Sequence, residues 1–212
     1  MIKNYCFFGE RHSGTNFLEV FLKKNLNLKE KNIKFKHWFD VECAIEQKNT
    51  NNTLFFFIVR NPYDWIYAMK KKPYHFARER DKLGWDDFLK EEWYSVTNNR
   101  WQTYEIMEDR NWMTGERYDN ILKMRTGKLY LINFLTKILR NTYVFRFEDF
   151  RDNNLIERKL KNIAYVYNLK LFPYHSDFAF NGYKRKKSVI DHINHDLDWT
   201  AESIFGYSPK LS

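Results

Sequence analysis

One continuous apolar run constrains the fold of this chain more than any other feature. Leu54 to Val59 reads Leu-Phe-Phe-Phe-Ile-Val without a polar break, and Arg60, Asn61 and Pro62 follow at once. A strand that faces water on one side alternates apolar and polar residues, whereas a strand covered on both faces is apolar throughout. The run therefore predicts a central strand of a parallel sheet with helices on both sides.

The segments around this run alternate between strand and helix patterns. Ile2 to Phe8 is short, apolar and aromatic and stops at Gly9, and apolar residues then recur at helical spacing behind Ser13. This order predicts an α/β fold, a P-loop-like parallel β-sheet flanked by helices, with a helical insertion near 80–140 and a single domain over 1–212. Further strands are predicted at 33–39 and 142–147, and further helices at 64–72, 85–106, 118–139, 155–166 and 198–204.

Charge and composition restrict the classes of molecule that this protein is expected to bind. The 212 residues carry a formal net charge of +9, while 43% of them are hydrophobic and 19% aromatic. This combination predicts a folded body whose partner is negatively charged: a nucleotide, a nucleic acid, a sulfated or phosphorylated substrate, or an anionic membrane surface. Cys6 and Cys43 fit no zinc or disulfide pattern, and no apolar run is long enough to span a bilayer. We expect a soluble, cytoplasmic protein that needs no metal.

The segment between the first strand and the first helix has the pattern of a phosphate-binding loop. It reads Gly9-Glu-Arg-His-Ser-Gly14-Thr15-Asn16, with glycines at both positions of GxxxxGK[ST] but without the lysine. A glycine lets the backbone approach a phosphate, and the hydroxyls of Ser13 and Thr15 can add hydrogen bonds. A helix cap and a turn glycine would explain the same letters, but the position between strand and helix favours anion binding.

Two motifs together resemble a known family. The run from Phe8 to Leu18 is similar to the 5′-phosphosulfate loop of sulfotransferases that use 3′-phosphoadenosine 5′-phosphosulfate (PAPS). The run Phe57-Ile-Val-Arg60-Asn61-Pro62-Tyr-Asp64 resembles the element of that family that binds the 3′-phosphate. Weaker similarities lie at 145–150 and 205–207. The resemblance implies PAPS as the donor and adenosine 3′,5′-bisphosphate (PAP) as the product.

The resemblance also implies roles for single residues. Phe17 would lie against the adenine, and Arg60 would pair with the 3′-phosphate. The serine that the family places eight residues after that arginine is Ala68 here, so a late basic loop would assist. The lysine that usually precedes Ser-Gly-Thr is His12, with Arg11 one residue earlier, and either could contact the transferring group. The implied donor-binding residues are Arg11, His12, Ser13, Gly14, Thr15, Asn16, Phe17, Arg60, Arg185 and Lys186.

Sulfuryl transfer also needs a base, because the attacking group of the acceptor must lose a proton. Lys36 and His37 end the strand predicted at 33–39, where sulfotransferases that use histidine keep their base behind a lysine. Histidine suits the task because its pKa lies near neutrality. We predict His37 as the base, with Arg11 and Lys36 as catalytic cations. Glu10 and Asp40 are alternative bases, and a structural histidine on an edge strand would also fit.

These observations favour a sulfotransferase that transfers the sulfuryl group of PAPS to a hydroxyl or amine of a small-molecule or glycan acceptor. Aromatic side chains within 80–140 would hold the acceptor. A P-loop kinase or NTPase is the first alternative, although Thr15 occupies the lysine position of that motif. A basic RNA-binding module is the second, although no RNA motif is present. The sequence favours neither a membrane nor a nucleic acid as partner, and it does not indicate an oligomeric state.

Overall fold

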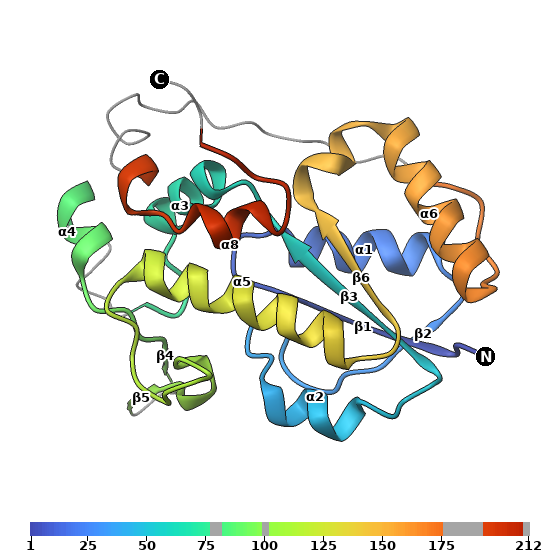
Figure 1. Ribbon diagram of the computed structural model, residues 1–212, viewed down its shortest axis with the longest axis horizontal. Coiled ribbons are helices and arrows are strands. Elements are labelled where there is room, and N and C mark those ends of the chain that lie inside the picture. The colour runs from blue at the N-terminus through green and yellow to red at the C-terminus, as the bar shows by residue number, and fades with distance from the viewer. Residues whose placement is uncertain (77–81, 99–101, 176–192, 210–212) are drawn as a thin grey trace. The chain divides into compact units, whose positions relative to one another are not determined.

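The computed structural model describes residues 1–76, 82–98, 102–175 and 193–209 (Figure 1). Contacts within the chain define two compact units, each with its own apolar core. The first unit comprises Met1–Asn61 and Leu135–Gly182, and the second comprises Pro62–Phe134 and Tyr183–Ser212. The first unit contains the sheet and the phosphate-type loop.

A four-stranded parallel sheet forms the centre of the first unit, in the order β2-β1-β3-β6. Every residue of β3 is buried, and Phe57 lies opposite Phe8 of β1 and Val144 of β6. This confirms the α/β fold and the central strand that the apolar run predicted. The strands are β1 (Asn4–Gly9), β2 (Lys29–Glu30), β3 (Thr53–Val59) and β6 (Thr142–Arg146).

Side chains on the two faces of this sheet enter separate apolar layers. On one face, Phe7 and Phe56 belong to a cluster that includes side chains of α1 (Thr15–Asn25) and α6 (Asn153–Tyr167). On the other face, the rings of Phe8, Phe39 and Phe57 contact one another with centroid distances of 5.8–6.0 Å. The helix α2 (Val41–Gln47) begins two residues after Phe39, and the 3-10 turn η3 (Phe147–Arg151) follows β6.

The second unit is largely helical. Its core surrounds Trp65, Phe88 and Trp93, and it also contains two buried ion pairs. In the described part of the chain, no helix combines the length and apolar character needed to cross a membrane. The elements are α3 (Pro62–Lys71), α4 (Trp85–Lys90), β4 (Val96–Asn98), β5 (Thr103–Glu105), η2 (Met107–Asp109), most of α5 (Ile121–Ile138), and α8 (Trp199–Ser203).

The strand predicted at 33–39 is wrong. Pairing between β1 and β2 stops where Tyr5 lies opposite Glu30. The next carbonyl, that of Lys31, accepts a hydrogen bond from Cys6 Sγ at 2.8 Å instead of one from the backbone of β1. Residues 31–36 then leave the sheet as an arch. The chain rejoins β1 at its far end, where Gly9 N–H donates to the carbonyl of Lys36 at 3.0 Å.

The single helix predicted over 85–106 is also wrong. Among the described residues of this range, α4 is the only helix, and β4 and β5 pair in antiparallel orientation with Val96 opposite Glu105. Trp93 is fixed by backbone hydrogen bonds to Tyr118, which end the helical path before the hairpin. The β-branched and aromatic residues of this stretch favour strands once such pairing is available. The other predicted helices correspond to α3, α5, α6 and α8.

Candidate functional site

The topology places one loop at the point where the connections of the sheet diverge. The chain passes from β1 through α1 to β2 on one side of β1, and then through α2 to β3 on the other side. Open α/β sheets bind ligands at such a point, outside the carboxyl ends of the strands. Residues 10–14, between β1 and α1, lie there (Figure 1).

Hydrogen bonds within this loop hold it in a tight turn. Ser13 N–H donates to the Glu10 carbonyl at 3.0 Å, and the Ser13 hydroxyl donates to the same oxygen. His12 and Gly14 have left-handed backbones, with φ of 59° and 102°. A side chain at position 14 would also overlap the ring of Phe147. Glycine is therefore required at this position by both backbone and packing.

The helix α1 begins without a side-chain cap. Gly14 occupies the N-cap position and has no side chain to accept a hydrogen bond from the first turn, and that turn contains no acidic residue. The first amides of a helix carry a partial positive charge and need acceptors. The start of α1 is thus suited to an anion, as the glycine pattern of the sequence indicated.

Arg11 is turned into the protein. Its side chain is 1% exposed, and its Nε donates to Glu10 Oε1 at 2.8 Å, as does its backbone N–H at 2.6 Å. In this structure the guanidinium of Arg11 neutralises Glu10 inside the loop, and its predicted contact with a ligand stays a prediction. The second carboxylate oxygen, Glu10 Oε2, is buried and has no hydrogen-bond partner among the described residues.

The arch returns His37 to the end of β1. His37 Nδ1 lies 2.8 Å from the carbonyl oxygen of Gly9. Because a carbonyl only accepts, Nδ1 carries the proton and Nε2 keeps the lone pair. The pKa of His37 is lowered to about 4, mainly by burial and to a smaller extent by the charges of Arg11 and Lys36, while the hydrogen bond to Gly9 and the charge of Glu10 oppose the change. The imidazole is neutral at pH 7 with a free lone pair on Nε2, but a pKa of about 4 makes it a weaker base than the near-neutral histidine expected from the sequence.

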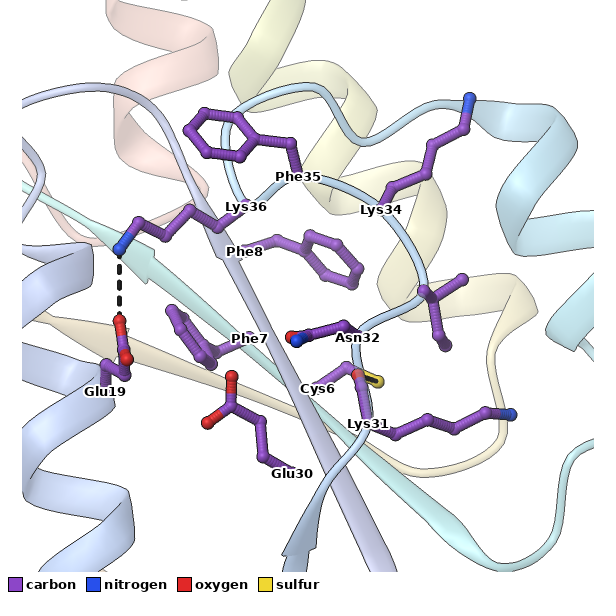
Figure 2. Close-up of a pocket in the computed structure, with 11 residues that line it drawn as sticks. Cys6, Phe7, Phe8, Glu19, Glu30, Lys31, Asn32, Lys34, Phe35 and Lys36 are labelled. Carbon is purple, nitrogen blue, oxygen red and sulfur yellow. Dashed lines mark hydrogen bonds and ion pairs between the residues drawn. The ribbon is translucent and has the colours of Figure 1, made fainter.

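Lys36 connects the arch to the first turns of α1. Its Nζ donates to Asn16 Oδ1 at 2.5 Å and to Glu19 Oε2 at 3.1 Å, the second contact being visible in Figure 2. The ammonium also lies 5.5 Å from the centroid of the Phe7 ring. The structure thus brings Lys36 next to the loop, as the sequence predicted, with Asn16 and Glu19 fixing its position.

Arg60 and Phe147 bring the ends of β3 and β6 to the same loop. Arg60 is 7% exposed, and its Nη1 donates to the His12 carbonyl at 2.9 Å. Its guanidinium lies 4.8 Å from the centroid of the Phe147 ring, which in turn covers Gly14. Sequence reasoning missed Phe147, whose only signal was the aromatic run after the late strand. Glu148 beside it accepts a hydrogen bond from Asn61 N–H at 2.9 Å.

The remaining predicted residues are less clearly placed for a ligand. Phe17 is half-buried, and its ring packs against Phe147 and Phe150 with centroid distances of 5.8 and 4.8 Å. Arg185 and Lys186 lie outside the described residues. Among the described residues, no group of three or more His, Cys, Asp and Glu side chains could hold a metal ion. Around the loop the structure gathers His12, Ser13, Gly14, Thr15, Asn16, Lys36, His37 and Arg60.

No protein-family model matches the chain, and no significant match was found among curated proteins or solved structures. The function is therefore inferred from the chemistry of the site.

Proposed function

We propose that this protein is a PAPS-dependent sulfotransferase that acts on a hydroxyl or amine of a small-molecule or glycan acceptor. One observation carries the proposal. A neutral histidine is hydrogen-bonded to Gly9, and the loop that follows Gly9 leads into a helix start that has no side-chain cap. Such a site combines a proton acceptor with an anion-binding position, which are the two requirements of sulfuryl transfer.

The donor side of the proposal uses the loop and Arg60. The 5′-phosphosulfate would lie against the backbone amides at the start of α1, where Gly14 leaves no side chain in the way. The 3′-phosphate would pair with the guanidinium of Arg60, which the backbone of His12 and the ring of Phe147 already hold in place. A charge-assisted contact of this kind is among the stronger hydrogen bonds in proteins.

The acceptor side uses His37. The acceptor oxygen or nitrogen attacks sulfur with its lone pair, and the bond between sulfur and the 5′-phosphate oxygen breaks. The electron pair of that bond leaves with PAP, and the proton of the acceptor passes to His37 Nε2. A depressed pKa keeps the ring unprotonated before this step, and the nearby Lys36 cation favours the negative charge that develops on the phosphate.

A thermal-shift panel tests the donor assignment. PAP should raise the melting temperature more than ATP with magnesium or a short RNA does, because a ligand that binds only the folded state stabilises it in proportion to ln(1 + [L]/Kd). Equal shifts for PAP and ATP, or a shift with ATP and magnesium alone, would favour the nucleotide-hydrolysing or kinase reading. A shift with RNA alone would favour the RNA-binding module.

Two variants test whether Arg60 contributes to the binding of PAP. Arg60→Ala should weaken PAP binding by about 2–3 kcal/mol, the range of a charge-assisted hydrogen bond. Arg140→Ala is the matched control, since Arg140 is an exposed arginine that donates to Asn51. Transfer itself is measured with PAPS that carries radiolabelled sulfur and a panel of phenols, amines and glycans. PAP binding without a labelled product on any acceptor class would indicate a nucleotide-binding protein rather than an enzyme.

A further inference from the structure

A pocket of about 440 Å³ lies between the edge of β1 and the arch of residues 31–36 (Figure 2). This volume is in the range of sites for small molecules. The pocket owes its existence to the early end of the β1–β2 pairing, because the arch takes a longer path than the strand segment that it spans. Neither His37 nor the loop of residues 10–14 lines it.

The floor of the pocket contains an open piece of strand edge. Lys31 N–H donates to the Tyr5 carbonyl at 2.8 Å, and Gly9 N–H donates to the Lys36 carbonyl at 3.0 Å, so the backbone groups of Tyr5 and Gly9 face the arch. Backbone groups of alternate strand residues point the same way, which directs the N–H and C=O of Phe7 to that side too. Within residues 1–76, no backbone hydrogen bond joins Phe7 to the arch.

The charged side chains around the pocket are paired with one another or with neighbouring residues. Lys31 is exposed and donates to the neutral Gln47 Oε1 at 3.2 Å, whereas the other charged side chains of the lining are in ion pairs, so most of the charge in the pocket is balanced, which suits a neutral ligand. Lys36 pairs with Glu19 at 3.1 Å, and Glu30 pairs with Lys23 at 3.0 Å. Lys34 pairs with Asp40.

Aromatic rings supply the apolar part of the lining. Phe7 and Phe8 extend from β1, and Phe35 stands at the rim of the arch (Figure 2). The Phe35 ring is 48% exposed and is supported from behind by Trp38, with a centroid distance of 4.5 Å. Phe7 and Phe8 are themselves buried, so Phe35 is the ring that is open to a ligand, and its flat face favours a planar molecule.

We infer that this pocket binds a small, neutral, planar molecule with an amide-type edge, that is, an aromatic carboxamide or a nucleobase. Its acceptor and donor pair with the N–H and C=O of Phe7, as a residue of a neighbouring strand would. A peptide strand is disfavoured, because hydrogen bonds at Tyr5 and Gly9 leave only one open residue between them. The inference does not rest on the proposed function, because the ligand contacts that carry it are at Phe7 and Phe35, although Lys36 belongs both to the pocket lining and to the proposed transfer site.

Nuclear magnetic resonance of the full chain tests the inference at the atoms that it names. Benzamide is the probe, and benzoate and benzylamine, which have the same ring with a charged group, are the controls. Benzamide should shift the Phe7 amide signal saturably and more than the signals of exposed sites. At a concentration ten times its Kd, it should slow hydrogen exchange at that amide about tenfold relative to the free protein. The two charged analogues should bind more weakly.

Two variants separate the pocket from general binding. Phe35→Ala removes an exposed ring at the rim and should raise the Kd for benzamide about fivefold, within the range of one aromatic contact. Tyr165→Ala, at an 87% exposed position of α6, should leave that Kd unchanged. The inference is overturned if benzamide does not bind, if the charged analogues bind as tightly, if saturable shifts occur away from Phe7, or if Phe35→Ala has no effect.

Discussion

The Nδ1 atom of His37 donates a hydrogen bond to the carbonyl oxygen of Gly9 across 2.8 Å, although the two residues are 28 positions apart. This bond joins the end of the arch to the last residue of β1. It also decides the tautomer, since the proton resides on Nδ1 and the lone pair on Nε2. The contact therefore links the stability of the fold to the protonation of the candidate base.

The first prediction concerns the pH dependence of folding. The pKa of His37 falls from 6.5 to about 4 on folding, because burial disfavours the charged ring. This contribution to stability is complete above pH 6.5 and is lost as the pH falls through 4, with a total of up to about 3 kcal/mol. Urea unfolding measured between pH 7 and 4 should show this loss.

His37→Asn should reduce that pH slope, because an amide can still donate to Gly9 but does not titrate in this range. His195→Asn is the matched control: the His195 side chain is 90% exposed, so the slope should stay as in the unmodified protein. An unchanged slope for His37→Asn would mean that other groups produce the loss of stability.

The second prediction concerns turnover and rests on the proposed sulfotransferase activity. His37→Ala should lower kcat by about 10²-fold or more, because the base is gone, while the affinity for PAP stays nearly the same. The acid limb of the pH profile should disappear with the group that causes it. His195→Ala should behave like the unmodified protein. Normal turnover would remove His37 from the mechanism, and lost PAP affinity with normal turnover would assign it to the donor site.

The third prediction concerns the contact between Gly14 and Phe147. Gly14→Ala should destabilise the protein by about 3 kcal/mol, because a left-handed backbone with φ of 102° and overlap with the Phe147 ring both oppose a side chain. Gly115→Ala is the matched control: φ is 73°, but nothing lies within 4 Å of the added carbon. Its cost should be about 1 kcal/mol, that of the backbone alone.

A double-mutant cycle measures how much of the extra cost of Gly14→Ala comes from overlap with the Phe147 ring. Phe147→Ala should make Gly14→Ala less costly, giving a coupling free energy of about 1 kcal/mol or more in urea unfolding. Additive effects would show that the ring moves away at no cost.

The fourth prediction concerns a buried ion pair in the second unit. Arg125 on α5 and Glu202 on α8 are 5% and 1% exposed, and Arg125 Nη2 lies 2.8 Å from Glu202 Oε2. Glu202→Ala should destabilise the protein by about 3–5 kcal/mol, because it leaves the guanidinium buried without its carboxylate. Urea unfolding gives the value.

The control is Glu157→Ala, which removes an ion pair of similar length, 2.7 Å, to the exposed Lys161 on α6. Its cost should stay below about 0.5 kcal/mol, as for other surface pairs. Similar costs for Glu202→Ala and Glu157→Ala would contradict the difference in burial on which the prediction rests.

The sequence by itself determined the elements whose apolar residues recur at regular spacing within a few positions. The apolar run at Leu54–Val59 became β3, and the segment between Gly9 and Thr15 became the loop before α1. The same holds for α5 and α6, whose apolar residues recur every three or four positions. These elements could be predicted because alternation and helical spacing depend only on neighbours within a few residues.

Only the tertiary structure decided what lies around the loop. The strand predicted at 33–39 does not form, because backbone hydrogen bonds of Lys31 to Tyr5 and of Lys36 to Gly9 hold residues 31–36 as an arch. Arg11 faces inward because Glu10 receives it, and the Phe147 ring reaches Gly14 from far along the chain. The charge state of His37 likewise depends on burial, which no local pattern encodes. Each of these features depends on contacts between segments that meet only when the sheet assembles. The pattern of either segment alone therefore cannot predict it.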